Sequence, residues 1–428
     1  MNRLLIISFT ATVTLTVALV GCAAEPEDIP DPEPIQFAPN DWPWWRGPHR
    51  NGVAAANQDL PLHWSATENV VWSTPVPGRG HGAVTVMGDQ LFLATADKAL
   101  QIQSVICYDR DSGKQQWQTT IHEGGFVKGQ NQKASHASSS VACDGRQLFI
   151  SFLHDGRLLT TALDRSGNLV WQTQISDYVM HQGYGASPAP YESLVIVAAD
   201  NKGGGAIAGL HRATGQIVWT HTRPKTPNYS SPIILNAAGR DQLVMIGCNR
   251  VASFDPLTGG ALWKIEGATT ECVTSTVTDG QHVFSSGGYP TNHLAAIRAD
   301  GSGEIVWQHD LRIYVPSMIE HEGCLYAVTD AGVAMCLRCD TGQEQWKKRL
   351  GGSFSASLVL ADDNLFATNE EGQTFIFKAD PEKFQLVAEN KLGEELFATP
   401  TICGGRIYMR AASYDGQLRS ETLYCLGR

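Results

Sequence analysis

The sequence predicts an all-β fold, namely an eight-bladed β-propeller of four-stranded antiparallel blades that is closed by pairing its N-terminal and C-terminal strands. Three observations lead to this prediction: a Gly turn followed by Trp recurs along the chain, small residues open each repeat, and each terminal strand lacks a neighbour of its own. No long segment shows the 3.6-residue period of an amphipathic helix, so a repeated β unit is the organisation that the sequence favours.

The first observation is a unit in which an apolar strand leads to a polar turn, and Trp stands four residues after the Gly of that turn. The pairs are Gly113 and Trp117, Gly167 and Trp171, Gly215 and Trp219, Gly259 and Trp263, Gly303 and Trp307, and Gly342 and Trp346. Trp72 is an earlier Trp without its turn, and Val387 takes the corresponding place in an eighth repeat. Successive Trp residues are 39 (Trp307 to Trp346) to 54 residues (Trp117 to Trp171) apart, and a four-stranded blade needs about 40–45 residues. We therefore predict that Trp72 and the six paired Trp residues dock each blade against its neighbour.

The second observation is a run of small residues at the start of each repeat. These runs are His81-Gly82-Ala83, Ser138-Ser139-Ser140, Ala186-Ser187-Pro188, Ser230-Ser231-Pro232, Thr274-Ser275, Pro316-Ser317, Ala356-Ser357 and Ala398-Thr399-Pro400. Innermost strands crowd around the axis of a propeller, where only small side chains fit. Eight such runs predict eight blades.

The third observation concerns the two ends of the repeated region. The final strand, residues 422–427, resembles the third strand of a repeat but has no Trp strand after it, and the strand with Trp72 has no partner before it. Pairing the two completes the eighth blade and removes both sheet edges.

The N-terminus carries a targeting signal. Arg3 gives a short positive region, an apolar stretch runs from Leu4 to Val20, and Leu19-Val20-Gly21-Cys22 matches the bacterial lipobox. We predict that residues 1–21 are a lipoprotein signal peptide and that Cys22 is lipidated. The alternative is an ordinary signal peptide that contains a Cys. Ala23 after the Cys does not signal retention in the inner membrane, so the periplasmic face of the outer membrane is the predicted location.

Two further segments follow the signal. Residues 22–41 are acidic and Pro-rich and read as an extended tether, because they cannot bury enough apolar area to fold. Residues 42–428 form the propeller domain. Trp42, Trp44 and Trp45 at its start either pack an N-terminal arm onto the body or contact a partner.

Composition limits the function. The formal net charge is −11 and no basic stripe is present, so we expect no nucleic acid partner. Apart from Cys22 nine Cys residues remain, most of them inside apolar strand patterns, and we expect buried core residues in preference to disulfides. Cys336 and Cys339 have no second Cys or His pair at zinc spacing, so no metal site is predicted.

One set of side chains is a candidate binding site. Residues just before the small inner-strand runs should ring one mouth of the central channel, and they are rich in aromatic and His side chains. The candidates are His81, His136, Tyr184, Tyr229, Glu271, Tyr314, Phe354 and Phe397. Such a ring suits a peptide strand, a glycan or a small ligand. The alternative is that these residues only plug the mouth.

The alternation of Ser-Ser-Pro strands with turns of the form Leu-x-x-x-Thr-Gly-x-x-x-Trp resembles the PQQ-like β-propeller repeat over about residues 42–428. The opening WPWWRGPHRNGVA and the later GGSFSASLVLADDNLFATNEEGQTFIFKA resemble secreted propellers of planctomycete-type bacteria. Eight blades behind a lipobox also resemble the propeller lipoprotein of the outer-membrane β-barrel assembly complex. The resemblance implies fold more strongly than activity.

The resemblance also implies an alternative activity. Quinoprotein dehydrogenases of this repeat family clamp PQQ between a Trp and a disulfide of adjacent Cys residues, hold Ca²⁺ through a Glu/Asn/Asp set and use an Asp as base. This sequence has no adjacent Cys pair. We therefore expect no cofactor and no catalytic residue, with a PQQ- and Ca²⁺-dependent dehydrogenase or a small-ligand binder as the alternative.

The favoured function is that of a non-enzymatic periplasmic lipoprotein that binds envelope proteins or peptides as a scaffold. It would contact the membrane through its lipid anchor only and act as a monomer.

Overall fold

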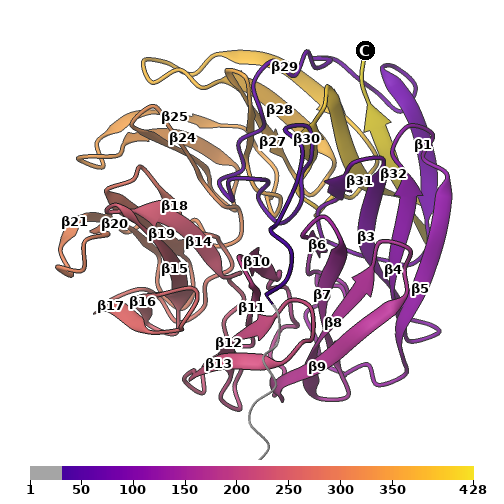
Figure 1. Cartoon of the computed structure of the whole chain (residues 1–428). Helices are drawn as coiled ribbons and strands as arrows, with labels where there is room; N and C mark the ends of the chain where they lie inside the picture. The colour runs from indigo at the N-terminus through magenta and orange to yellow at the C-terminus, as the bar shows by residue number, and fades with distance from the viewer. Residues whose placement is uncertain (1–30) are drawn as a thin grey trace, which may run out of the picture. The chain divides into compact units, whose positions relative to one another are not determined.

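Eight four-stranded antiparallel sheets follow one another around a ring in the computed structural model of the protein (Figure 1). The structure describes residues 31–428, so the predicted signal peptide and the lipidated Cys22 lie outside it. The ring belongs to one compact unit, Glu33–Arg428. No helix in the described residues is long and apolar enough to cross a membrane. The predicted all-β, eight-bladed propeller is confirmed.

The first four blades are numbered here in chain order, each from its innermost to its outermost strand. Blade 1 contains β2 (Thr85–Met87), β3 (Gln90–Asp97), β4 (Ile102–Asp109) and β5 (Gln115–Glu123), and blade 2 contains β6 (Ala142–Cys143), β7 (Gln147–His154), β8 (Arg157–Asp164) and β9 (Leu169–Asp177). Blade 3 contains β10 (Ala189–Tyr191), β11 (Leu194–Ala198), β12 (Ala206–His211) and β13 (Ile217–Thr222), and blade 4 contains β14 (Ile233–Ala237), β15 (Arg240–Gly247), β16 (Arg250–Phe254) and β17 (Ala261–Glu266).

The other four blades complete the ring. Blade 5 contains β18 (Val277–Thr278), β19 (His282–Gly287), β20 (His293–Arg298) and β21 (Ile305–His309), and blade 6 contains β22 (Ile319–His321), β23 (Cys324–Val328), β24 (Val333–Arg338) and β25 (Glu344–Arg349). Blade 7 contains β26 (Val359–Ala361), β27 (Asn364–Thr368), β28 (Gln373–Lys378) and β29 (Leu386–Lys391), and blade 8 contains β30 (Thr401–Cys403), β31 (Arg406–Asp415), β32 (Leu418–Leu426) and β1 (Val70–Val76).

Blade 8 contains both ends of the repeated region, as the sequence predicts. Strand β1 pairs with β32 in an antiparallel register that runs from Val70 opposite Leu426 to Val76 opposite Glu421. A buried Arg410 side chain then joins this blade to the first one, because it donates to the carbonyl oxygen of Ala94 (2.7 Å) and to the hydroxyl of Thr95 (3.1 Å). Arg410 is also paired with Glu421, and both side chains are almost fully buried.

The recurring Trp residues lie between blades. The indole ring of Trp171 in blade 2 covers Gly215 in the turn of blade 3, so closely that a methyl group on that Gly would lie 2.5 Å from ring atoms. Gly113, Gly167, Gly259 and Gly342 have the same relation to the Trp of the preceding blade. Since a side chain there would collide with the ring, the Gly-to-Trp spacing in the sequence records a contact between neighbouring blades.

Hydrogen bonds add to this docking. The indole N–H donates to a backbone carbonyl of the following blade for five of the Trp residues: Trp72 to Arg110 (3.1 Å), Trp117 to Arg165 (3.1 Å), Trp171 to Arg212 (2.7 Å), Trp307 to Cys339 (2.8 Å) and Trp346 to Asp380 (2.7 Å). Trp263 instead donates to Gln242 of its own blade, and the Trp219 N–H has no partner among the described residues.

A second ring of contacts explains why the inner runs contain Ser and Thr as well as small residues in general. At six junctions a backbone N–H of one blade donates to a hydroxyl of the next, at 2.9–3.0 Å. The donors and acceptors are Ala83 and Ser140, Ser140 and Ser187, Ser187 and Ser231, Ser275 and Ser317, Ser317 and Ser357, and Ser357 and Thr399. The hydroxyls therefore satisfy buried backbone donors that no strand can reach.

We expect Gly215→Ala to destabilise the protein more than Gly239→Ala. Both Gly residues have a similar positive φ, +73° and +75°, but a methyl group at Gly239 meets no atom within 4 Å. The backbone cost of about 1–2 kcal/mol is common to both variants, and overpacking against Trp171 adds about 1–3 kcal/mol for Gly215→Ala. Urea unfolding of the two variants measures this difference, and equal losses would show that the Trp–Gly contact is not tightly packed.

We expect Arg410→Ala to lower the free energy of unfolding by about 3–5 kcal/mol, because it leaves Glu421 in the interior with half of its pairing lost. The matched control is Arg298→Ala, which removes an ion pair between exposed side chains, Arg298 and Glu304, and should leave the unfolding midpoint almost unchanged. Thermal unfolding followed by circular dichroism measures both. Similar midpoints for the two variants would contradict the role of Arg410 in closing the ring.

Candidate functional site

One end of the central channel opens into a cavity of about 640 Å³, called the mouth cavity here. Its wall includes seven of the eight residues that the sequence analysis selected: His81, Tyr184, Tyr229, Glu271, Tyr314, Phe354 and Phe397. They meet because each stands just before an inner strand, and these strands start at the same end of the ring. Their use as ligand contacts stays a prediction.

His136 is the exception, because it does not line the mouth cavity. Its ring stacks on Phe126, with 3.9 Å between the ring centroids. The connection between β5 and β6 is long, and in this blade Ser138 reaches the cavity wall instead. His136 borders a separate small cavity of about 10 Å³, which Ser138 and Tyr184 also line. The predicted ring at the mouth is therefore corrected at this position, where Ser138 stands in place of His136.

An N-terminal arm, residues 33–64, runs across one face of the ring before β1 (Figure 1). The arm is attached to several blades by backbone contacts: Trp42 bridges Val86 in blade 1, and Val53 bridges Leu360 in blade 7. These contacts begin at Glu33, whose carbonyl accepts a hydrogen bond from Arg212 (2.8 Å). The docked chain therefore starts before the predicted domain boundary at Trp42.

Trp45 of the arm forms the floor of the mouth cavity. Its indole N–H donates to the hydroxyl of Ser275 (2.8 Å) in blade 5. At this junction, between blades 4 and 5, no backbone donor takes the hydroxyl, and the arm supplies one. Trp42, Trp44 and Trp45 thus pack the arm onto the body, one of the two roles that the sequence analysis allowed.

Arg46 fixes the arm in place. Its guanidinium is buried and donates to the backbone carbonyls of Leu358 (3.1 Å) and Asn51 (2.7 Å), and to that of Met318. Burial lowers the pKa of Arg46 to about 9. The side chain thus holds blades 6 and 7 and the arm together.

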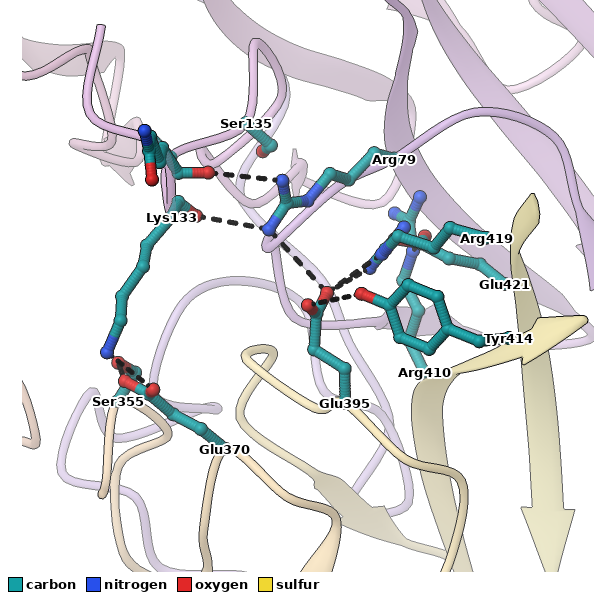
Figure 2. A network of polar contacts seen from close by, with 12 residues as sticks. Arg79, Lys133, Ser135, Ser355, Glu370, Glu395, Arg410, Tyr414, Arg419 and Glu421 are labelled. Atoms are coloured by element: carbon teal, nitrogen blue, oxygen red, sulfur yellow. Dashed lines mark hydrogen bonds and ion pairs between the residues drawn. The ribbon is translucent and has the colours of Figure 1, made fainter. Parts of the chain in front are cut away.

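A strap over the mouth, residues 131–135, comes from the connection between β5 and β6. The backbone N–H of Asn131 donates to the backbone carbonyl of Gln182, in the connection between β9 and β10 (2.9 Å). Lys133 reaches Glu370 (2.7 Å), which also accepts a hydrogen bond from Ser355 (2.6 Å) (Figure 2). The Lys133 side chain is 63% exposed, so this ion pair adds little stability and can open without a large cost.

A charged network forms the rim between blades 1 and 8 (Figure 2). Glu395 forms ion pairs with Arg419 (2.6 Å) and Arg79 (3.5 Å) and accepts a hydrogen bond from the hydroxyl of Tyr414 (2.9 Å). His81 lies beside this network and stacks on Phe397, with 4.6 Å between centroids. Burial lowers the pKa of His81, and the nearby Arg side chains lower it further, so this wall of the cavity presents a neutral imidazole.

Two carboxylates of the mouth cavity, Asp330 and Glu271, accept hydrogen bonds from different kinds of donor. Asp330 accepts the backbone N–H groups of Tyr314 (2.8 Å) and Val315 (3.2 Å), whereas Glu271 accepts the hydroxyl of Tyr314 (3.1 Å). Burial raises the pKa of Tyr314, and the charge of Glu271 raises it further, so the phenol stays a neutral donor.

These residues do not fit a PQQ and Ca²⁺ pair. Within residues 31–428, no three His, Cys, Asp or Glu side chains are grouped to hold a metal ion. The nine Cys residues of this part of the chain are buried free thiols in the blades, and none lines the mouth cavity. The disulfide clamp and the oxygen ligands that the family's enzymes need are therefore not assembled by these side chains.

Sequence reasoning missed part of the cavity wall. Trp45, His181, Arg312, Asp330 and Glu370 also line it. Trp45 comes from the arm, Asp330 and Glu370 come from loops after the second strand of a blade, and His181 and Arg312 come from connections after the fourth strand. No repeat position marks them. Trp45 alone had a signal, namely its place in the Trp-rich opening of the domain.

Comparison with known proteins supports the fold. The chain matches the protein family described as "Outer membrane protein assembly factor BamB" over residues 51–177, 101–348 and 337–421. A protein of that name from Yersinia pestis is 25% identical over 385 residues, which are 84% of this chain and 88% of the relative. A polyvinylalcohol dehydrogenase from Sphingopyxis sp. (strain 113P3) is 26% identical over 288 residues, 64% of this chain and 39% of the enzyme.

Solved structures show the same architecture. The crystal structure of BamB from Moraxella catarrhalis matches with a TM-score of 0.60 at 17% identity, over 83% of this chain and 96% of the other. A europium-containing methanol dehydrogenase matches with a TM-score of 0.64 at 12% identity, over 92% and 99%. At these identities the likeness is one of fold alone.

We expect acid to destabilise the protein in part through His136. Burial lowers the pKa of His136 to about 4, and Lys98 contributes, whereas an unfolded His titrates near 6.5. Between these two values the unfolded chain binds more protons, so stability falls as the pH drops from 7 to 5. Urea unfolding at both pH values should show a smaller loss for His136→Gln than for the wild type. The exposed His63 provides a control: His63→Gln should lose as much stability between the two pH values as the wild type does. If His136→Gln also loses as much as the wild type, the assignment is refuted.

Proposed function

Because the chain belongs to the family described as outer membrane protein assembly factor BamB, we propose that it is a non-enzymatic, protein-binding scaffold for outer-membrane protein assembly. The family match runs from residue 51 to residue 421 and thus includes parts of all eight blades. The Yersinia pestis relative aligns with most of both chains, so the whole ring is shared and not one repeat.

The observation that carries the proposal is the mouth cavity. It is lined by Trp45 of the arm and by aromatic side chains from several blades. Aromatic rings give large contact areas at a low cost in conformational entropy, and they dominate protein–protein binding energies. A cavity of about 640 Å³ has room for one or two side chains of a partner polypeptide, held by rings around and a rigid floor beneath.

The proposal places the protein at the periplasmic face of the outer membrane, anchored through lipidated Cys22. Support comes from the signal-like residues 1–21 and the lipobox match, and from the name of the relatives, which refers to assembly of outer membrane proteins. The partners would be envelope proteins or peptides, and contact with the membrane would be through the lipid only.

The enzymatic alternative has weaker support. The polyvinylalcohol dehydrogenases match through the propeller but extend well beyond it, since this chain accounts for 39% and 33% of their lengths. The mouth cavity also lacks the side-chain set for PQQ and Ca²⁺ described above. The geometry therefore favours binding over oxidation.

A photo-cross-linking amino acid in place of Tyr289 should capture envelope proteins in living cells. Tyr289 lines the mouth cavity and is 52% exposed, so its replacement disturbs little packing while it faces an incoming partner. The expected result is one or a few defined adducts, identified by mass spectrometry, with proteins of outer-membrane assembly among them.

The matched control uses Phe37, which is 40% exposed on the N-terminal arm and does not line the mouth cavity. Adducts from Phe37 but none from Tyr289 would contradict a partner at the mouth. Stoichiometric binding of PQQ with Ca²⁺, together with dye-linked oxidation of an alcohol, would overturn the scaffold function itself.

A further inference from the structure

Glu271 differs from the other buried acids of residues 31–428. Five carboxylate side chains belong to residues that are 3–5% exposed: Asp41, Asp144, Asp200, Glu271 and Glu421. Four of them are paired with Arg, namely Asp41 with Arg110, Asp144 with Arg212, Asp200 with Arg223 and Glu421 with Arg410. Glu271 alone has no Arg or Lys within ion-pair distance in this part of the chain. Buried charges are normally paired, so Glu271 lacks the Arg partner that the other four buried acids have.

The partners that Glu271 does have are weaker. One carboxylate oxygen lies 3.3 Å from Nδ1 of His181, and the other accepts the Tyr314 hydroxyl at 3.1 Å. The same imidazole nitrogen lies 3.3 Å from the hydroxyl of Tyr229. These groups fix the position of the carboxylate on the cavity wall and provide no permanent positive charge for it.

The wall around Glu271 suits a cation with a flat face. Tyr229, Tyr314 and Tyr289 surround the carboxylate side of the cavity, with Phe354 further around the wall. One cation of the protein already uses this wall: the guanidinium carbon of Arg312 lies 5.0 Å from the Tyr314 ring centroid. Arg312 donates to the carbonyl of Gly288 and does not reach Glu271. Aromatic faces attract such cations through the negative potential of the ring.

We propose that the mouth cavity recognises an arginine side chain presented by a partner protein, with Glu271 as the acceptor and the tyrosine rings as its walls. This inference rests on the proposed scaffold function and names the chemistry by which the scaffold selects a partner. Arginine fits better than lysine because its planar guanidinium bonds a carboxylate with two N–H groups, stacks on rings and is less strongly hydrated.

The test measures binding of three blocked tripeptides, Gly-Arg-Gly, Gly-Lys-Gly and Gly-Gln-Gly, to the purified full-length protein by isothermal titration calorimetry. The expected order of affinity is Arg, Lys, Gln, with the Arg peptide at least about tenfold tighter than the Gln peptide, as for a charge-assisted hydrogen bond. Glu271→Gln keeps the shape and an acceptor for Tyr314, and it should abolish the preference for Arg.

The matched control is Glu304→Gln, which removes an equal charge from an exposed carboxylate that pairs with Arg298 and does not line the mouth cavity. This variant should keep the preference for the Arg peptide. Thermal unfolding of both variants shows that they are folded. Equal affinities for the Arg and Gln peptides, no binding of the Arg peptide at millimolar concentration, or an unchanged preference in folded Glu271→Gln would each overturn the proposal.

Cross-linking from Tyr289 separates this inference from the scaffold function. Adducts that persist at equal yield in Glu271→Gln would retain the scaffold and reject arginine recognition. Adducts that fall in Glu271→Gln but not in Glu304→Gln support arginine recognition in the cell. If the cross-linker at Tyr289 gives no adduct in the otherwise wild-type protein, the mouth is rejected as a protein-binding site, whatever affinities the peptides show.

Discussion

The interface between neighbouring blades is the constraint on which the rest of the molecule depends. Five blades present a Gly-containing turn to the Trp of the preceding blade, and six present a hydroxyl to its inner backbone N–H. The first contact fixes the outer spacing of the blades and the second fixes the inner spacing. Because both recur around the axis, the angle between blades is set locally, and the width of the channel follows from it.

These contacts explain why the fold could be predicted from the sequence. A Trp that packs on Gly of another repeat must recur in step with that Gly, so the chain records the interface as a fixed spacing, seen for Gly215 and Trp219. The pairing of β1 with β32 could be predicted as well, because a propeller tolerates no free strand at its seam. The extent of the arm could not be predicted. Its residues 33–41 are acidic and Pro-rich, yet they dock through backbone groups such as the carbonyl of Glu33, which composition does not reveal.

The candidate site was predictable only where it follows the repeat. Residues such as Tyr229 and Phe397 lie on the cavity because they precede an inner strand. His136 precedes one too, but its ring stacks on Phe126 of the long connection between β5 and β6 and does not line the mouth cavity. Glu271 was chosen by position, and its significance comes from what is missing around it. Among residues 31–428, no Arg or Lys lies within ion-pair distance of this one buried carboxylate, and that is a three-dimensional property. The other buried acids pair with Arg from distant parts of the chain, as Asp144 does with Arg212.

The seam in blade 8 has a consequence for the order in which the protein folds. Val70 lies opposite Leu426, so the first strand of the ring waits for the last one to be synthesised. Until then, blade 1 and blade 7 each present an uncovered flank, and nascent edges of this kind are prone to aggregation. Closing so long a loop is also slow, because its entropy is lost before the contact is gained. A chaperone that shields the emerging chain would therefore matter most just before β32 is released. Removal of part of β32 would leave β1 without its partner in an otherwise complete ring.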